Sequence, residues 1–158
     1  MKTLESEDDF EGSEEEYKFG PKHDISVVPY ASNGALDNAY SVDGNIVTVS
    51  YGVPCKVGYF NGSKYIALDA VANDDGSYSF TVEDEIVEEV VLVIKGDVDL
   101  NGMIIGADAV LLRRIALQKN DASDVQLFAG DVNGDGYTNG PDAVLLQRIA
   151  LRKTENNW

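Results

Sequence analysis

The chain of 158 residues lacks the residues that several functional classes require. It has one cysteine, Cys55, so an internal disulfide is impossible, and we expect this thiol to be buried packing. It has one histidine, His23, and no Ser/His/Asp or Cys/His set, so we do not expect an enzyme; a catalytic domain of the parent protein would lie outside this chain. No apolar run approaches the roughly 18 to 20 residues that cross a bilayer, so we expect no membrane insertion.

Basic residues are also scarce, with 12 Lys and Arg against 28 Asp and Glu and a net charge of -16. A nucleic-acid binder must neutralise phosphates with a basic surface, so this balance argues against nucleic acid and suits a cation. Residues 1–16 contain eight acidic residues and one lysine, which predicts a disordered tail or linker over residues 1–19. The start has no basic and apolar stretch of a secretory signal, so we expect the chain to be cut from a longer protein.

Residues 20–95 have the pattern of a β domain, because short segments rich in Val, Ile, Tyr and Phe alternate with turn signals. The predicted strands are His23–Tyr30, Tyr40–Val42, Ile46–Tyr51, Cys55–Phe60, Tyr65–Val71, Tyr78–Val82 and Val90–Ile94. Asp43-Gly44 and Asn61-Gly62 are hairpin signals between strands. The run VVLVI over Val90–Ile94 is typical of a strand that is covered on both faces. We therefore predict a small antiparallel β-sandwich.

Residues 96–158 contain an internal repeat. DVDLNGMIIGADAVLLRRIALQK at 97–119 and DVNGDGYTNGPDAVLLQRIALRK at 131–153 are identical at 14 of 23 positions, with an offset of 34 residues. Tetratricopeptide repeats share this period, but they have no Asp/Gly-rich loop, and two copies are too few to stack stably. Each unit is instead a loop followed by a helix.

Each repeat opens with a twelve-residue loop that has oxygen side chains at positions 1, 3, 5 and 12. Because alternate side chains of a curled loop point inward, these oxygens converge on one point, and position 7 adds a main-chain carbonyl. Hard oxygen ligands favour calcium, and no soft ligand favours zinc or copper. The sequence therefore predicts two Ca²⁺ ions. The expected ligands are Asp97, Asp99, Asn101, Met103 and Asp108 in the first loop, and Asp131, Asn133, Asp135, Tyr137 and Asp142 in the second.

The two loops differ from a standard EF-hand and from each other. Position 12 is Asp rather than Glu, so its shorter arm must approach the ion more closely. Position 9 is Ile105 in the first loop and Asn139 in the second, and only the asparagine can hold a bridging water. We therefore expect the second site to be the better formed.

The helices after the loops have two faces. Leu111, Leu112 and Ile115, with Leu145, Leu146 and Ile149 in the second copy, form the predicted core stripe. The other stripe combines apolar residues with arginine, which suits a protein-binding surface. A simpler alternative is that the arginines serve the helix dipoles beside small surface hydrophobics. Between the repeats, residues 121–128 predict a linking helix whose Leu127 and Phe128 fill the core between the two units.

The duplicated motif DVDLNGMIIGADAVLLRRIAL and DVNGDGYTNGPDAVLLQRIAL resembles the dockerin modules of bacterial cellulosomes and amylosomes. The resemblance covers about residues 95–153 and implies an all-α module with two calcium-loaded F-hands in near-twofold symmetry, which binds a cohesin of a scaffold protein. Together with the apolar positions of the exposed stripe, the implied partner-binding residues are Gly106, Ala107, Val110, Arg113, Arg114, Leu117, Gln118, Gly140, Pro141, Val144, Gln147, Arg148, Leu151 and Arg152. Gly-Ala and Gly-Pro at loop positions 10 and 11 depart from the hydroxylated residues of many dockerins, which leaves the cohesin type open.

The β segment resembles the Ig-like X modules that precede some dockerins. The expected fold class is therefore α+β in two modules, with a tail at 1–19, an antiparallel Ig-like sandwich at 20–95 and an all-α dockerin at 96–158. The resemblance implies calcium-dependent docking that anchors a parent protein in a cellulosome-like complex for polysaccharide degradation. It also implies an extracellular or cell-surface location on a bacterium, as in Gram-positive anaerobes, and a monomer when unbound.

Two other functions stay open at the level of sequence. The first is a calcium sensor or buffer, which would bind calcium without a stable cohesin complex. The second is carbohydrate binding by the sandwich, with the calcium module in a structural role. Aromatic residues that could stack on sugars are Tyr30, Tyr40, Tyr51, Tyr59 and Phe60.

Overall fold

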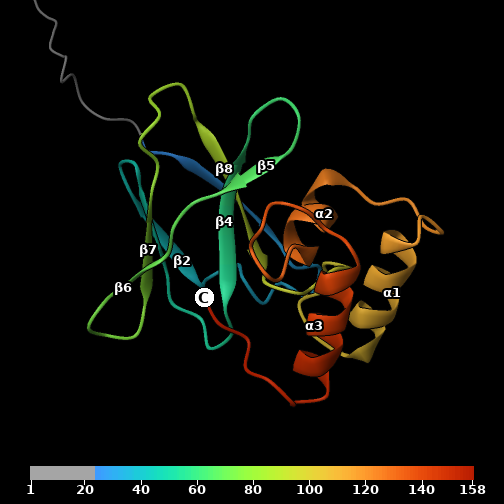
Figure 1. The fold of residues 1–158 in the computed structure, drawn as a ribbon. Helices are drawn as coiled ribbons and strands as arrows, with labels where there is room; N and C mark the ends of the chain where they lie inside the picture. Colours follow the sequence, from blue (N-terminus) through green and yellow to red (C-terminus); the bar gives the residue numbers. More distant parts are fainter. Residues whose placement is uncertain (1–23) are drawn as a thin grey trace, which may run out of the picture.

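The computed structural model describes residues 24–158, which form eight strands and three helices (Figure 1). The predicted tail at residues 1–19 and His23 lie outside the described residues. The strands are β1 Ser26–Tyr30, β2 Tyr40–Asp43, β3 Ile46–Val49, β4 Cys55–Phe60, β5 Tyr65–Ala67, β6 Val71–Ala72, β7 Tyr78–Thr81 and β8 Glu89–Ile94. The helices are α1 Gly106–Ala116, α2 Asp124–Gly130 and α3 Gly140–Ala150. Within residues 24–158, no helix is both long and apolar enough to cross a membrane.

The strands form two four-stranded sheets, with the orders β1-β8-β4-β5 and β2-β3-β7-β6. β1 and β8 pair in parallel, from Ser26 opposite Glu89 to Tyr30 opposite Val93, whereas the other pairs are antiparallel. The prediction of an antiparallel sandwich is therefore wrong. Hairpin signals report pairing between neighbours in sequence, and β1 and β8 come from opposite ends of the β segment.

The prediction of an all-α dockerin is also wrong, because residues 96–158 are helical but belong to one mixed structure of strands and helices. They contribute two long loops and three short helices to this structure. α2 packs directly on β8, where Val91 and Val93 share a hydrophobic cluster with Val125, Phe128 and Ala129. We call residues 24–95 the β part and residues 96–158 the helical part.

Strand β8 is buried on both faces, as the VVLVI run predicts. Val90, Leu92 and Ile94 point into the cluster between the two sheets, where they meet residues of β3 and β7. The alternate residues of β8 face α2. Gly58 on the neighbouring β4 leaves the room for this helix, because a Cβ there would lie 2.6 Å from a ring carbon of Phe128.

Two details of the β part differ from the sequence prediction. The predicted strand Tyr65–Val71 is two strands, and the chain passes between them from one sheet to the other. The first hairpin turns at Gly44–Asn45 rather than Asp43–Gly44, because Asp43 already pairs with Ile46. Gly44 has φ 61°, the left-handed conformation that such a tight turn requires. Cys55 is buried in the core between the sheets, as predicted, and burial raises its pKa to about 12.

The two repeats share a core in which α1 and α3 pack together. Leu112, Ile115 and Leu146 are buried there, and Leu127 of α2 packs against the same cluster. The expectation that Phe128 also fills this core is wrong, since its ring faces β8 instead. After α3 the chain returns to the β part (Figure 1), where Trp158 stacks on Tyr78 with ring centroids 4.1 Å apart.

Candidate metal centres and docking surface

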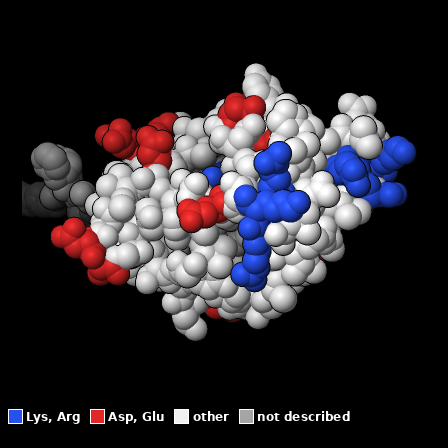
Figure 2. Space-filling view, turned by 60° about the horizontal axis from the view of Figure 1, so that its bottom comes forward, with Lys and Arg blue, Asp and Glu red and all other residues white. Residues whose placement is uncertain are grey.

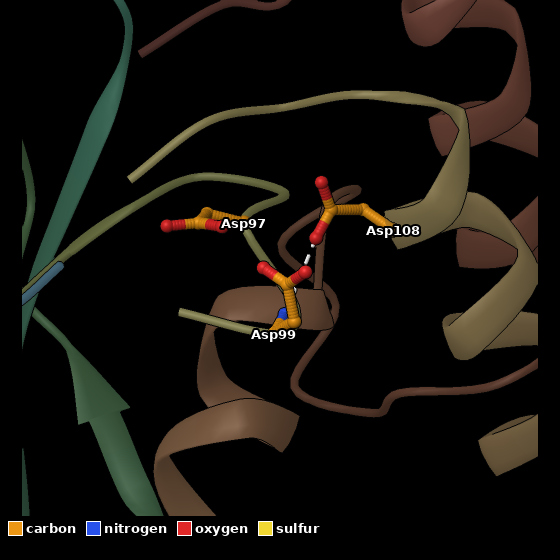
Figure 3. Close-up of side chains that lie close together, drawn as sticks. All are labelled: Asp97, Asp99 and Asp108. Carbon is orange, nitrogen blue, oxygen red and sulfur yellow. Dashed lines mark hydrogen bonds between the residues drawn. The ribbon is translucent and has the colours of Figure 1, made fainter. Parts of the chain in front are cut away.

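The first loop is organised by two buried carboxylates that accept main-chain hydrogen bonds. Asp97 accepts from Gly102 N at 2.7 Å and from Asn101 N at 3.3 Å. Asp108, in the first turn of α1, accepts from Asp99 N at 3.2 Å (Figure 3) and from Ile105 N at 3.0 Å. These bonds tie both ends of the loop to its middle. Gly102 has φ 96° at loop position 6, where an EF-hand loop turns sharply and requires glycine.

The second loop repeats this arrangement. Asp131 accepts from Gly134 N at 3.1 Å and from Gly136 N at 2.9 Å. Asp142 accepts from the main-chain N–H groups of Val132, Asn133 and Asn139, at 2.9, 3.1 and 2.9 Å respectively. Gly136 again has a positive φ, 88°. The same backbone is therefore built twice.

Each loop gathers three carboxylates. Oxygens of Asp97, Asp99 and Asp108 all lie within 4.8 Å of one another, and Figure 3 shows these side chains coming from the loop and from the start of α1. The second loop brings Asp131, Asp135 and Asp142 equally close. The third carboxylate stands at loop position 3 in the first repeat and at position 5 in the second, and an asparagine takes the other position. Both loops thus offer the same set of oxygen donors.

Burial without a cation is unfavourable for these groups. Removal from water, together with the neighbouring Asp108 and Asp99, raises the pKa of Asp97 to about 7, although the hydrogen bond from Gly102 opposes the rise. Burial likewise raises the pKa of Asp108 to about 6 and raises the pKa of Asp142. Like charges at this separation repel strongly in a low-dielectric setting, and a bound divalent cation reverses that cost. The residues present therefore fit a hard cation with oxygen ligands.

The other predicted ligands lie on the same loops. Asn101 accepts from Met103 N and Asn133 from Asp135 N, each with its amide oxygen turned into its own loop. The side chains of Met103 and Tyr137 are exposed. This exposure agrees with a role for their main-chain carbonyls rather than for their side chains.

A groove of about 630 Å³ runs between α1 and α3 on the face away from the shared core. Four large apolar side chains are more than half exposed along it: Val110, Leu117, Val144 and Leu151. Gly106, Arg113, Gly140 and Gln147 line it as well. The structure thus brings eight of the fourteen predicted partner-binding residues into one groove. The other six are exposed outside its lining: Ala107, Arg114, Gln118, Pro141, Arg148 and Arg152.

Both helices end in the same way. Gln118 and Arg152 have φ 61° and 60°, and the residue after each donates to a carbonyl five residues back, from Lys119 N to Arg114 O and from Lys153 N to Arg148 O. This is the left-handed ending that closes a helix and satisfies its last carbonyls. This helix ending fixes the direction in which the exposed side chains of Gln118 and Arg152 leave the helices.

Charge divides between the two parts of the molecule. In Figure 2 the Lys and Arg side chains gather on the side of the helices, and most Asp and Glu side chains lie toward the β part. Six of the nine basic residues in the described chain belong to the helical part: Arg113, Arg114, Lys119, Arg148, Arg152 and Lys153. The basic face of an otherwise acidic protein is thus beside the groove.

The sequence interpretation missed the contacts that the β part makes with the second loop. Lys56 of β4 is buried, and its ammonium donates to Phe128 O at 2.7 Å and to Asp131 O at 3.1 Å. Lys64 donates to Gly136 O at 3.0 Å. Burial lowers the pKa of Lys56 to about 8, and the negative charge of Asp131 opposes this shift. The available signal was a lysine within the apolar strand CKVGYF, because a charge that is buried there needs a partner.

Residues 95–150 match the family of dockerin type I domains. A chain of a solved complex from Acetivibrio cellulolyticus is similar at 39% identity; the match covers 39% of this chain and 88% of that chain, with a TM-score of 0.38. That complex contains the third cohesin of ScaC and the ScaB dockerin with a mutation in its N-terminal helix (IN to SI), displaying a type I interaction. No curated protein matches the chain. With its duplicated loop and helix, this chain belongs over residues 95–150 to the dockerin type I family.

Proposed function

We propose that the chain is a calcium-dependent docking module that binds a cohesin through the face formed by α1 and α3. A dockerin type I domain is a non-catalytic docking module, which fits the absence of a catalytic set from the sequence. The observation that carries the proposal is that both acidic loops lead directly into helices whose matching residues border one groove. Order in the loops therefore sets the position of the surface.

Each of the two loops would bind one Ca²⁺ ion. Asp97, Asp99, Asn101 and Asp108 with the Met103 carbonyl would hold one ion. Asp131, Asn133, Asp135 and Asp142 with the Tyr137 carbonyl would hold the other. Calcium supplies positive charge to three gathered carboxylates and accepts oxygen ligands in a flexible geometry. Its binding would join position 1 of each loop to the first turn of the following helix.

The exposed face formed by α1 and α3 has the composition of a protein-binding surface. Exposed Val and Leu side chains on both helices border the groove, and arginines stand beside them. Apolar anchors with a basic rim are typical of protein interfaces, and the arginines suit a partner with acidic groups at its edge. A cohesin supplies such a protein partner. The unbound chain is proposed to be a monomer.

A docking function also implies the kind of complex in which the chain acts and the location of that complex. A docking module attaches the protein that carries it to a scaffold, so we assign this chain the anchoring of its parent protein in a cellulosome-like complex. Such a complex lies outside the cell or at its surface, where calcium is abundant.

Calorimetric titration of a cohesin panel into the chain tests the function, and a cohesin that displays a type I interaction is the first choice. We expect a stable complex in calcium and none in EDTA. Replacing Val110 and Val144 together by Asp should weaken binding at least about a hundredfold, because it places two charges in an apolar contact. The matched control is Ile86→Asp, since Ile86 is 84% exposed on the β part.

Three results would contradict different parts of the proposed function. Calcium binding without a complex with any cohesin would favour the sensor or buffer. A complex that is equally strong in EDTA would contradict calcium dependence. Equal losses for the valine variant and for Ile86→Asp would show that the groove is not the interface.

A further inference from the structure

The β part contacts the helical part through all of its basic residues. Residues 24–95 contain three lysines and no arginine, namely Lys56, Lys64 and Lys95. Each ammonium donates to a main-chain carbonyl of the helical part, and the accepting residues are Phe128 and Asp131, Gly136, and Asn157. Because the β part is otherwise acidic, the contact of all three lysines with the helical part indicates that they have a specific role there.

Lys56 is the most deeply placed of the three, with 8% of its surface exposed. Its ammonium lies 3.9 Å from Asp131 Oδ2 and 4.3 Å from the centre of the Phe128 ring. It also binds the carbonyls at the end of α2 and at the first position of the second loop. A full positive charge is therefore fixed at the point where this loop begins.

The carboxylate beside Lys56 is the one that shapes the loop. Asp131 accepts from Gly134 N and Gly136 N, so it holds the turn around which the second loop closes. Asp131 also stands within 4.8 Å of Asp135 and Asp142. A fixed ammonium offsets part of the repulsion among these three groups, and its effect is strong where water is excluded.

The first loop has a different neighbour. The β part reaches it through a neutral bond from Ser32 N to Leu100 O, 2.9 Å long, and through the amide of Asn33 beside Gly102. Across residues 24–158 the structure shows no ion pair to Asp97, Asp99 or Asp108. The two loops thus have matching backbones and different electrostatic surroundings.

We propose that Lys56 is a built-in counter-cation that keeps the second loop folded before calcium arrives, whereas the first loop is ordered by the metal itself. This inference rests on the proposed function, in which both loops bind calcium. Lys56 acts as a positioning residue: it fixes Asp131 and the end of α2 without being a ligand. Before calcium binds, the second loop and the start of α3 are therefore already folded.

Hydrogen exchange of the full chain in EGTA tests the inference at matched amides. Gly102 N donates to Asp97, and Gly136 N donates to Asp131, so they report the same bond in the two loops. In the wild-type chain we expect exchange at Gly136 to be at least about tenfold slower than at Gly102. Lys56→Met should remove that difference. Lys95→Met should preserve it, because Lys95 bonds Asn157 rather than the loop.

Added calcium separates this inference from the proposed function. Calcium should slow exchange in both loops of both variants, which also shows that Lys56→Met still folds. If calcium leaves both loops unchanged, the calcium function fails. Equal exchange of Gly102 and Gly136 in wild-type EGTA samples overturns the role of Lys56, and so does an unchanged difference in a folded Lys56→Met variant.

Discussion

The two repeats have almost the same backbone but different neighbours. Both loops place a buried Asp at each end, and both helices start from a carboxylate in their first turn. The first loop meets the neutral turn at Ser32 and Asn33, whereas the second meets two lysines. The repeat therefore determines the shape of each unit, and the β part makes the two units unequal.

The two loops share their backbone conformation even at loop position 4, where their residues differ. Leu100 has φ 60° and its counterpart Gly134 has φ 75°, although only glycine adopts this conformation without cost. For a leucine the left-handed conformation costs roughly 1–2 kcal/mol. Leu100 also packs against the cluster between β8 and α2. Contact with the β part thus offsets strain in the first loop, and the second loop needs no such contact.

Removing the last carboxylate of either loop should have the largest effect. Asp108→Ala and Asp142→Ala should each abolish one calcium site, and each leaves buried N–H groups without partners at about 1–3 kcal/mol apiece. We expect losses of about 3 kcal/mol or more in calcium. The loss should be larger for Asp142→Ala, because Asp142 accepts from three main-chain groups and Asp108 from two. Urea unfolding in calcium measures this difference.

Asparagine variants at the same positions separate the two contributions. Asp108→Asn and Asp142→Asn keep an oxygen acceptor but lose the charge, so calcium binding should fall more than stability in EDTA. Equal calcium binding by wild-type and variant chains would contradict the assignment of the ligands.

The basic residues beside the groove should have an intermediate effect on cohesin binding. Arg113→Ala with Arg114→Ala removes two guanidinium groups from the first repeat, and Arg148→Ala with Arg152→Ala removes two from the second. If a cohesin engages both helices, each pair should weaken binding about tenfold, which corresponds to about 1.4 kcal/mol. Calorimetry at two salt concentrations measures both affinity and screening.

The relative size of the two losses sharpens the comparison of the repeats. Equal small losses would support binding of the cohesin in either of two orientations, which exchange the roles of the two repeats. One dominant loss would reject that hypothesis and would identify the repeat that contributes most.

The smallest expected effect concerns loop position 9. Ile105 and Asn139 precede α1 and α3 as N-cap residues, and asparagine is much the better residue there. Ile105→Asn should stabilise the chain by about 0.5–1 kcal/mol and bring the first site closer to the second. Thermal unfolding in calcium measures the gain. The reverse change, Asn139→Ile, is the matched control and should have the opposite sign.

The sequence predicted what depends on residues close together in the chain. The spacing of Asp97, Asp99 and Asp108 identified a carboxylate cluster because a curled loop brings alternate side chains to one point. The apolar run at Val90–Ile94 likewise identified the strand that is buried on both faces. Both patterns are complete within about a dozen residues.

Contacts between distant segments were outside the reach of such patterns. The parallel pairing of β1 with β8 joins two segments that have six other strands between them in the sequence, and no turn signal encodes it. Phe128 was assigned to the wrong core, because a helix pattern does not specify which neighbour covers each face. Lys56 lies 75 residues before Asp131 in the sequence, so no local pattern indicates that the two side chains meet.

Native mass spectrometry of the chain with a cohesin tests the central claim most directly, because one spectrum counts both metal ions and partner. The account predicts a complex that carries two calcium ions on this chain and dissociates when they are removed. A cohesin complex formed by the metal-free chain would contradict it.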